Sequence, residues 1–141
     1  MSTELKLIKE WTSEETTYIR DHLKSYNSQF TSNIPFSKPE PINLIIRKDD
    51  SIIAGLIGVM YWGCFHIDIL WVDEKYRKQE YGTELLKKSE EIARENNCNF
   101  IHLDTLSFQA QEFYEKNGYT VFGELKGYPE DIVRYYMKKE L

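Results

Sequence analysis

The feature that most constrains the fold is residues 66–97, where a strand-like run passes through a charged turn into an amphipathic helix. Residues 66–72 are mostly apolar, with Asp68 as the only acid. After the turn, apolar residues recur at i, i+1, i+7 and i+8 from Leu85, which is typical of a helix with one buried face. A strand that leads through a basic turn into a helix N-terminus directs unpaired backbone N–H groups at one point. This pattern predicts an anion site, above all for phosphate, although an ordinary strand–helix connection explains it equally well.

Two common phosphate-binding loops are absent from the sequence. There is no G-x-x-x-x-G-K-[ST], and no G-x-G-x-x-G follows a predicted strand. Residues 76–86, YRKQEYGTELL, instead resemble the pyrophosphate loop of the GNAT superfamily of N-acetyltransferases. In that family a Tyr-Arg pair leads into an Arg/Gln-x-x-Gly-x-Gly/Ala loop and a Leu-rich helix. The matching residues are Tyr76, Arg77, Gln79, Gly82, Leu85 and Leu86, whereas Lys78 and Glu80 stand where the family often has glycine.

A second segment strengthens the resemblance. Residues 103–119, LDTLSFQAQEFYEKNGY, look like a later strand and helix of the family, commonly Asn-x-x-Ala-x-x-hydrophobic-Tyr-Glu-Lys-x-Gly-Phe/Tyr. Ser107 takes the place of the Asn. The matching residues are Ala110, Phe113, Tyr114, Glu115, Lys116, Gly118 and Tyr119. The two motifs occur in the family's order, and the resemblance covers roughly residues 42–125.

The order of predicted elements gives an α/β fold of the three-layer α+β type. We expect a mixed, mostly antiparallel central sheet of about seven strands, flanked by helices, in a single domain of residues 1–141. The expected strands are 4–8, 42–48, 52–62, 66–72, 100–106, 120–125 and 134–139. The expected helices are 13–25, 82–97 and 109–117. Thr12 and Glu15 form a capping box at the start of the first helix.

Composition narrows the function classes. Asp and Glu number 23 against 18 Lys and Arg, giving a net charge of −5, which is unfavourable for non-specific nucleic-acid binding. The sequence has no secretory signal and no apolar run near the ~18 residues of a membrane helix, so we expect a cytoplasmic protein with no membrane partner. Its three histidines are scattered and its two cysteines form no CxxC, so we expect no metal site. A homodimer is left open.

Acetyl transfer from a thioester to an amine needs a base for the ammonium and an acid for the departing thiolate. The resemblance implies that Tyr114 is the acid, because the family's tyrosine in this motif commonly protonates the coenzyme sulfur. The alternative is a core tyrosine with its hydroxyl bonded to backbone.

Asp68 is the candidate base, acting directly or through a water. An outward-facing or salt-bridged acid is an equally good interpretation of this residue. His66 lies two residues away, on the same side of an ideal strand, and could assist or replace it.

The resemblance also implies that acetyl-CoA is the acyl-donor cosubstrate. Backbone groups of Leu70, Trp71 and Val72 would pair with its pantetheine arm, and Ser107, Ala110 and Phe113 would lie near that arm. The turn that would hold the pyrophosphate contains Arg77, Lys78, Gln79, Glu80, Tyr81, Gly82 and Thr83. Because a carboxylate repels phosphate, we expect the Glu80 side chain to point into solvent.

The sequence therefore predicts an N-acetyltransferase that moves an acetyl group directly to a primary amine of a small molecule or peptide. A catalytically silent acyl-CoA-binding module of the same fold is the alternative, since two loop glycines are missing. A protein-interaction domain would be a third class, but no sequence feature favours it directly.

Overall fold

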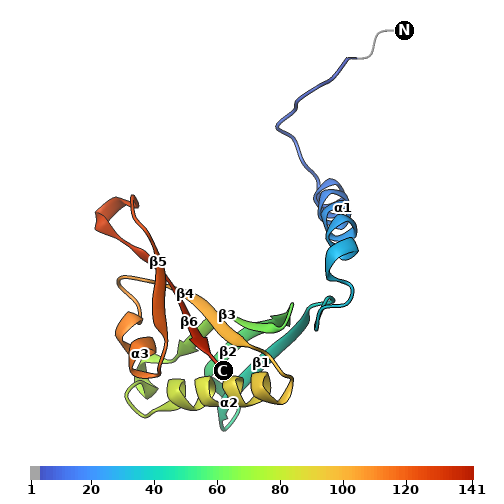
Figure 1. The fold of residues 1–141 in the computed structure, drawn as a ribbon. Helices are drawn as coiled ribbons and strands as arrows, with labels where there is room; N and C mark the ends of the chain where they lie inside the picture. Colours follow the sequence, from blue (N-terminus) through green and yellow to red (C-terminus); the bar gives the residue numbers. More distant parts are fainter. Residues whose placement is uncertain (1–3) are drawn as a thin grey trace. The chain divides into compact units, whose positions relative to one another are not determined.

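The computed structural model describes residues 4–141 and divides them into two compact units, one ending at Asn33 and the other covering Ile34–Leu141. Figure 1 shows the six strands of the second unit as a single twisted sheet with helices packed on it. No helix within residues 4–141 combines the length and the apolar character needed to cross a membrane.

The first unit contains helix α1 (Ser13–Thr31). Thr12 caps it as predicted, since its Oγ1 accepts a hydrogen bond from the Glu15 N–H at 3.2 Å. The helix continues beyond the expected end near Ser25, because the first proline after it comes only at Pro35. The predicted strand at residues 4–8 is wrong, since these residues adopt no strand. Alternation of polar and apolar residues marks two faces, but a strand also needs a hydrogen-bonded neighbour.

The sheet has the order β1-β2-β3-β4-β6-β5. Its strands are β1 (Glu40–Lys48), β2 (Ser51–Tyr61), β3 (Cys64–Val72), β4 (Phe100–Leu106), β5 (Thr120–Leu125) and β6 (Arg134–Glu140). Every neighbouring pair is antiparallel except β3 and β4, which run parallel. The predicted mixed, mostly antiparallel sheet flanked by helices is confirmed, with six strands rather than about seven.

The sheet forks between β3 and β4. The two strands pair only at Cys64 with Phe100, Phe65 with Ile101 and His66 with His102. Beyond this point β3 continues alongside β2 as far as Val72, while β4 continues alongside β6 as far as Leu106. The second half of β3 and the second half of β4 therefore form the two arms of a fork.

A β-bulge lies where the fork opens. Gly58 pairs with Ile67 and Ile57 pairs with Ile69, so Asp68 is an extra residue on β3. Gly58 is required at this place, because a Cβ there would come within 2.5 Å of the Phe65 ring and 2.8 Å of the His66 carbonyl oxygen.

Helices α2 (Tyr81–Glu95) and α3 (Gln111–Lys116) contribute to the buried core of the sheet. Leu85, Leu86 and Ala93 supply the buried face of α2, and Tyr114 supplies that of α3. The strands contribute core residues including Leu56, Phe65, Ile67, Ile101, Leu103 and Met137. Gly118, at φ 92°, follows the end of α3 in the left-handed conformation that glycine favours.

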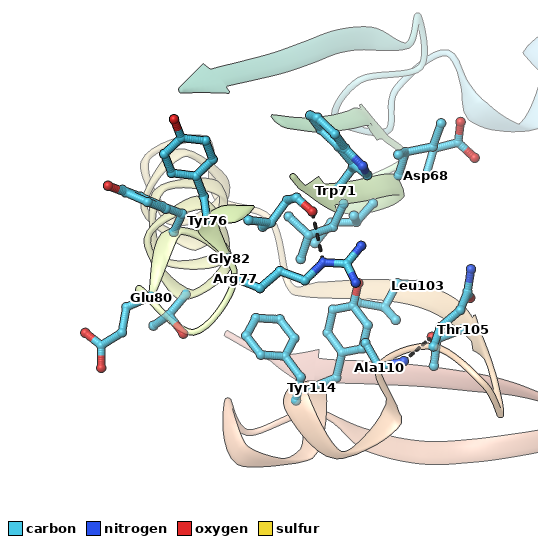
Figure 2. A pocket seen from close by; sticks show the side chains of 18 of the residues that line it. Asp68, Trp71, Tyr76, Arg77, Glu80, Gly82, Leu103, Thr105, Ala110 and Tyr114 are labelled. Carbon is cyan, nitrogen blue, oxygen red and sulfur yellow. Dashed lines mark hydrogen bonds between the residues drawn. The ribbon is translucent and has the colours of Figure 1, made fainter. Parts of the chain in front are cut away.

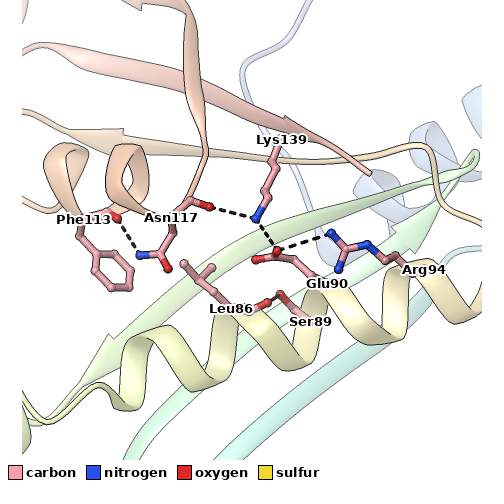
Figure 3. Close-up of polar contacts among 7 residues, drawn as sticks. All are labelled: Leu86, Ser89, Glu90, Arg94, Phe113, Asn117 and Lys139. Carbon is pink, nitrogen blue, oxygen red and sulfur yellow. Dashed lines mark hydrogen bonds and ion pairs between the residues drawn. The ribbon is translucent and has the colours of Figure 1, made fainter.

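A buried polar cluster joins α2, β6 and the end of α3 (Figure 3). Lys139 Nζ lies 2.6 Å from Glu90 Oε1 and donates a second hydrogen bond to the Asn117 carbonyl at 3.0 Å. Arg94 lies at the edge of the cluster, 3.9 Å from the same carboxylate oxygen. This cluster fixes α2 and α3 against the strand that neighbours β4.

Candidate active site

A cleft of about 730 Å³ opens between the two arms of the fork (Figure 2). Ligand sites of small molecules typically have volumes of roughly 300–1,000 Å³. The walls are the second half of β3, the turn after it, the first residues of α2, the end of β4, the loop that follows and α3. Most of the site residues predicted from the sequence line this cleft: Asp68, Leu70, Trp71, Val72, Arg77, Lys78, Glu80, Tyr81, Gly82, Thr83, Ala110, Phe113 and Tyr114. Gln79 and Ser107 are the two predicted residues that do not line it.

The turn before α2 places two non-glycine residues in the left-handed backbone region. Lys78 has φ 66° and Glu80 has φ 67°, at the two positions where the sequence motif often carries glycine. The loop thus keeps the backbone shape that glycine favours, at a cost in strain. Glu80 is exposed, and Figure 2 shows its side chain pointing away from the cleft, as expected from charge repulsion.

The N-terminus of α2 faces this turn. Glu80 stands at the N-cap without a side-chain hydrogen bond to the helix, and the first intrahelical bond runs from the Glu84 N–H to the Glu80 carbonyl. The N–H groups of Tyr81, Gly82 and Thr83 precede that bond and are the donors a helix start offers to an anion. Gly82 is packed closely: a Cβ there would lie 3.0 Å from the Phe113 ring and 3.7 Å from a Val72 methyl group.

Arg77 extends from the turn across the cleft (Figure 2). Its Nε donates a hydrogen bond of 3.1 Å to the carbonyl oxygen of Val72, the last residue of β3. The guanidinium therefore brings positive charge to the β3 wall. It also occupies one of the backbone groups that the sequence assigned to the pantetheine arm.

Tyr114 lies on α3 and is buried among core residues at the opposite wall. Burial, and then the nearby negative charge of Asp104, raise the pKa of its phenol to about 12. The hydroxyl is therefore protonated throughout the neutral range and can donate a proton. None of the hydrogen bonds among residues 4–141 involves this hydroxyl, unlike the backbone-bonded tyrosine of the alternative interpretation.

Asp68 lines the cleft from the bulge of β3 and is exposed. Figure 2 shows its carboxylate directed away from Tyr114. Asp68 is the extra residue of the bulge, so the regular alternation of faces that placed His66 beside it holds only as far as Ile67. His66 instead stacks on His102 of β4, with ring centroids 4.5 Å apart.

Several cleft residues were missed by the sequence reasoning. Asp104 lines the cleft from β4 and forms an ion pair of 3.3 Å with Arg134 Nε. Gln109 closes the following loop, where its Oε1 accepts a hydrogen bond from the Leu106 N–H at 2.8 Å. The other missed lining residues are Ile67, Ile69, Tyr76, Leu103, Thr105 and Phe108. Most of the missed residues lie in the second motif, residues 103–119. That motif was therefore the sequence signal from which they could have been predicted.

Ser107 contributes to the frame of the loop outside the cleft lining. Its N–H donates to the Val133 carbonyl at 2.8 Å, and its Oγ accepts from the Val133 N–H at 3.0 Å. These two hydrogen bonds connect the end of β4 to the residue before β6. They use the polar groups of Ser107 that were expected to reach the pantetheine arm.

Comparison with known proteins agrees with this geometry. Residues 5–119 match the model of the acetyltransferase (GNAT) family. The chain belongs to the GNAT family. Its GNAT relatives include the blasticidin-S acetyltransferase of Streptomyces morookaense, 35% identical over 91 residues that make up 64% of this chain and 67% of that protein.

Two solved structures resemble this GNAT chain along most of its length. The crystal structure of an acetyltransferase from Bacillus cereus ATCC 14579 has a TM-score of 0.86 and 36% identity, covering 96% of this chain and 98% of the other. A Bacillus anthracis str. Ames protein, assigned as a streptothricin acetyltransferase and solved in complex with acetyl coenzyme A, has a TM-score of 0.66 and 27% identity. That alignment covers 75% of this chain and 65% of the other.

Proposed function

We propose that this GNAT acetyltransferase moves an acetyl group from acetyl-CoA directly to the primary amine of a small molecule or peptide. The observation that carries the proposal is a single cleft with an anion-binding helix start at one end and a buried, protonated tyrosine in its wall. A coenzyme with a pyrophosphate and a thioester presents the two groups for which these features are suited.

The donor would lie along the fork. Its pyrophosphate would accept hydrogen bonds from the N–H groups at the start of α2, with Arg77 and Lys78 supplying positive charge. Binding would require Arg77 to release the Val72 carbonyl, which would free both groups for the ligand. The similar structure that holds acetyl coenzyme A supports this choice of donor.

The chemistry proceeds by direct attack. The amine, after losing a proton to a base, forms a bond to the thioester carbon, and the tetrahedral oxyanion collapses with the C–S electron pair moving to sulfur. The Tyr114 hydroxyl would give its proton to the thiolate and regain one from solvent. The sequence named Asp68 and His66 as candidate bases, and both lie where β3 leaves β4.

The acceptor class follows from charge as well as from relatives. The chain is acidic, and Asp68 and Asp104 line the cleft from opposite arms of the fork. Carboxylates there favour an acceptor that is cationic before it is acetylated. Relatives named for blasticidin-S and streptothricin acetylation agree with a small-molecule amine as the acceptor.

A silent acyl-CoA-binding module remains the second candidate, because Lys78 and Glu80 hold strained positions in the phosphate-facing turn. Calorimetry with acetyl-CoA and a thiol-release assay over a panel of primary amines test both candidates. Coenzyme binding with amine-dependent thiol release supports the enzyme. Binding with no release from any amine supports the silent module, and a lack of binding contradicts both.

A further inference from the structure

We propose that Asp104 binds a second, non-reacting cationic group of the acceptor, and that Arg134 occupies this position until the acceptor displaces it. The inference rests on the proposed acetyl transfer and narrows its acceptor to amines that carry another ammonium or a guanidinium group. Neither residue was among the site residues predicted from the sequence.

Asp104 projects from the face of β4 that is opposite to α2 and α3. Its neighbours Leu103 and Thr105 are buried, and side chains alternate along a strand. Leu103 belongs to the core that α2 and α3 complete, whereas Asp104 is exposed. All three residues line the cleft. At this arm of the fork the cleft is therefore lined from both faces of the sheet, and the carboxylate belongs to the face that the two helices leave open.

The charge of Asp104 does not suit the coenzyme. A pyrophosphate is anionic, and the groups that suit it, Arg77 and the helix start of α2, lie on the other arm of the fork. Asp104 is nevertheless close to the proposed acid, since its negative charge contributes, after burial, to the raised pKa of Tyr114. A carboxylate that lines the cleft near the acid and that repels the coenzyme phosphates is left for the acceptor.

Arg134 shows which kind of group this carboxylate takes. Asp104 pairs with Tyr136 in the register of β4 and β6, so Arg134, two residues from Tyr136, projects on the same face as a diagonal neighbour. Arg134 Nε lies 3.3 Å from Asp104 Oδ2. The chain thus supplies its own cation to a carboxylate that lines the cleft.

The ion pair is of a kind that another cation can replace. The side chains of Asp104 and Arg134 are 34% and 37% exposed, so solvent weakens their attraction. Arg134 Nε has no hydrogen-bond partner within residues 4–141, so charge alone holds it at the carboxylate. Its guanidinium carbon also lies 5.9 Å from the centre of the Tyr128 ring. Arg134 can keep this cation–π contact when Asp104 takes another partner.

The cation at Asp104 is not the nitrogen that reacts. The attacking amine has to be neutral, and a carboxylate in contact with an ammonium stabilises the charged form. Contact with Asp104 would therefore oppose loss of the proton from the reacting nitrogen. A second cationic group keeps its charge throughout the reaction, so Asp104 would hold it equally in the substrate complex and in the transition state. Binding of that kind lowers KM and leaves kcat unchanged.

The test compares acceptors that are matched in length and differ in one amine: 1,4-diaminobutane with 1-aminobutane, and 1,6-diaminohexane with 1-aminohexane. Steady-state thiol release gives kcat and KM for each. Asp104→Asn should raise KM for the diamines by about 10- to 100-fold, the scale of a hydrogen bond to a charged group, with kcat nearly unchanged. Its KM for the monoamines should stay within a few-fold of the parent. Arg134→Gln should lower KM for the diamines, because it removes the competing cation.

The control variant is Glu91→Gln. Glu91 forms an exposed ion pair of 3.4 Å with Lys88 on α2, outside the cleft, and its loss should leave the preference for diamines unchanged. Melting temperatures check that the variants fold. A parent with no preference for diamines overturns the proposal, and so does an equal change in Asp104→Asn and Glu91→Gln. A preference that is lost in Asp68→Asn and kept in Asp104→Asn would assign the second cation to Asp68 instead.

Calorimetry gives a readout that does not need turnover. The diamines are titrated into the parent and Asp104→Asn proteins, each saturated with coenzyme A, and we expect the parent to bind them about 10- to 100-fold more tightly. Equal affinities in the two proteins contradict the proposal. Diamine binding that depends on Asp104 without thiol release from any amine would support the cation site and contradict the proposed acetyl transfer.

Discussion

Lys139 Nζ lies 2.6 Å from Glu90 Oε1, which joins the last strand of the sheet to the middle of α2. The Glu90 side chain is 6% exposed and that of Lys139 24%, so this ion pair is shielded from water. The same ammonium also donates to the Asn117 carbonyl at the end of α3. One side chain thus connects three elements that support the cleft.

Removing the ammonium should be costly. Lys139→Met keeps the aliphatic stem but leaves Glu90 buried with Arg94 as its remaining partner, 3.9 Å away. We expect a loss of about 3 kcal/mol in the free energy of unfolding, measured by urea denaturation. Lys138→Met is the matched control, because its pair with Glu140 is exposed and should contribute less than about 1 kcal/mol. Equal losses in the two variants would show that burial of the Lys139 pair is unimportant.

Glu80→Gly should stabilise the protein slightly. Relief of the left-handed strain at φ 67° is offset in part by the greater freedom of glycine in the unfolded chain, leaving a net gain below about 1 kcal/mol. Glu84→Gly, within regular α2, should instead cost about 1 kcal/mol. Thermal or urea unfolding compares the two.

The same Glu80→Gly variant reports on the phosphate-facing turn. Because the Glu80 side chain points away from the cleft, acetyl-CoA affinity should change by less than roughly 1 kcal/mol, as for other exposed charges. A hundredfold gain in affinity by calorimetry would instead identify a defective loop and favour the silent module.

Gly82→Asp should abolish or strongly weaken coenzyme binding. It places a carboxylate at the helix start, and its Cβ would meet the Phe113 ring at 3.0 Å. Gly82→Ala separates these effects, because it brings the contact without the charge. We expect calorimetry to show a smaller loss for alanine than for aspartate. A folded aspartate variant that binds as tightly as the parent would place the coenzyme elsewhere.

Tyr114→Phe deletes the proposed acid while keeping the ring. We expect turnover to fall by about 10²–10⁴-fold with coenzyme affinity nearly unchanged. Because this hydroxyl takes part in no hydrogen bond within residues 4–141, stability should change by less than about 1 kcal/mol, the scale of one such bond. Steady-state thiol release and melting temperatures measure both. Full activity in this variant would remove Tyr114 from the mechanism.

Tyr119→Phe is the control for that experiment. Tyr119 packs edge-on against Tyr114 with ring centroids 5.9 Å apart, and its buried hydroxyl has no hydrogen-bond partner within residues 4–141. Deleting an unsatisfied hydroxyl should leave activity unchanged and stability equal or improved.

The pH dependence of the rate of thiol release tests the role of Tyr114 as the acid. A general acid must be protonated to act, and with its pKa raised to about 12 the Tyr114 phenol keeps its proton well above pH 8. Tyr114 should therefore produce no fall in the rate of thiol release between pH 6 and pH 10. A basic limb in that interval that disappears in Tyr114→Phe would contradict the buried environment described for it.

Much of the frame was predictable from local patterns. The bounds of β4 and β5 match the expected residues, because alternation and nearby turn residues define both ends. The start of α2, expected at Gly82 and found at Tyr81, was also predictable, since the glycine and the leucines after it mark the turn. The segment 4–8 failed because an alternating pattern alone does not provide a partner strand.

The cleft could not be predicted from local patterns, because its position depends on the register between strands that are distant in the sequence. The fork arises because β3 and β4 stop pairing after His66 and His102, and no local pattern states where two distant strands separate. The stacked pair, the position of Asp104 and the bridge from Ser107 to Val133 all follow from that register. The bulge at Asp68 had one signal, Gly58, but its partner residue became clear only once the strands were aligned.

The three residue pairs between β3 and β4 are the only backbone ladder, within residues 4–141, that connects the β1-β2-β3 half of the sheet to the β4-β6-β5 half. Because this ladder is so short, we expect it to act as a hinge about which the two halves of the sheet can move relative to each other. A long ligand that forms hydrogen bonds with both arms of the fork would restrict this movement. The amide hydrogens of Phe65 and Ile101, in the ladder between β3 and β4, should then exchange with solvent more slowly. Occupancy of the cleft would in this way govern how firmly the two halves of the sheet hold together.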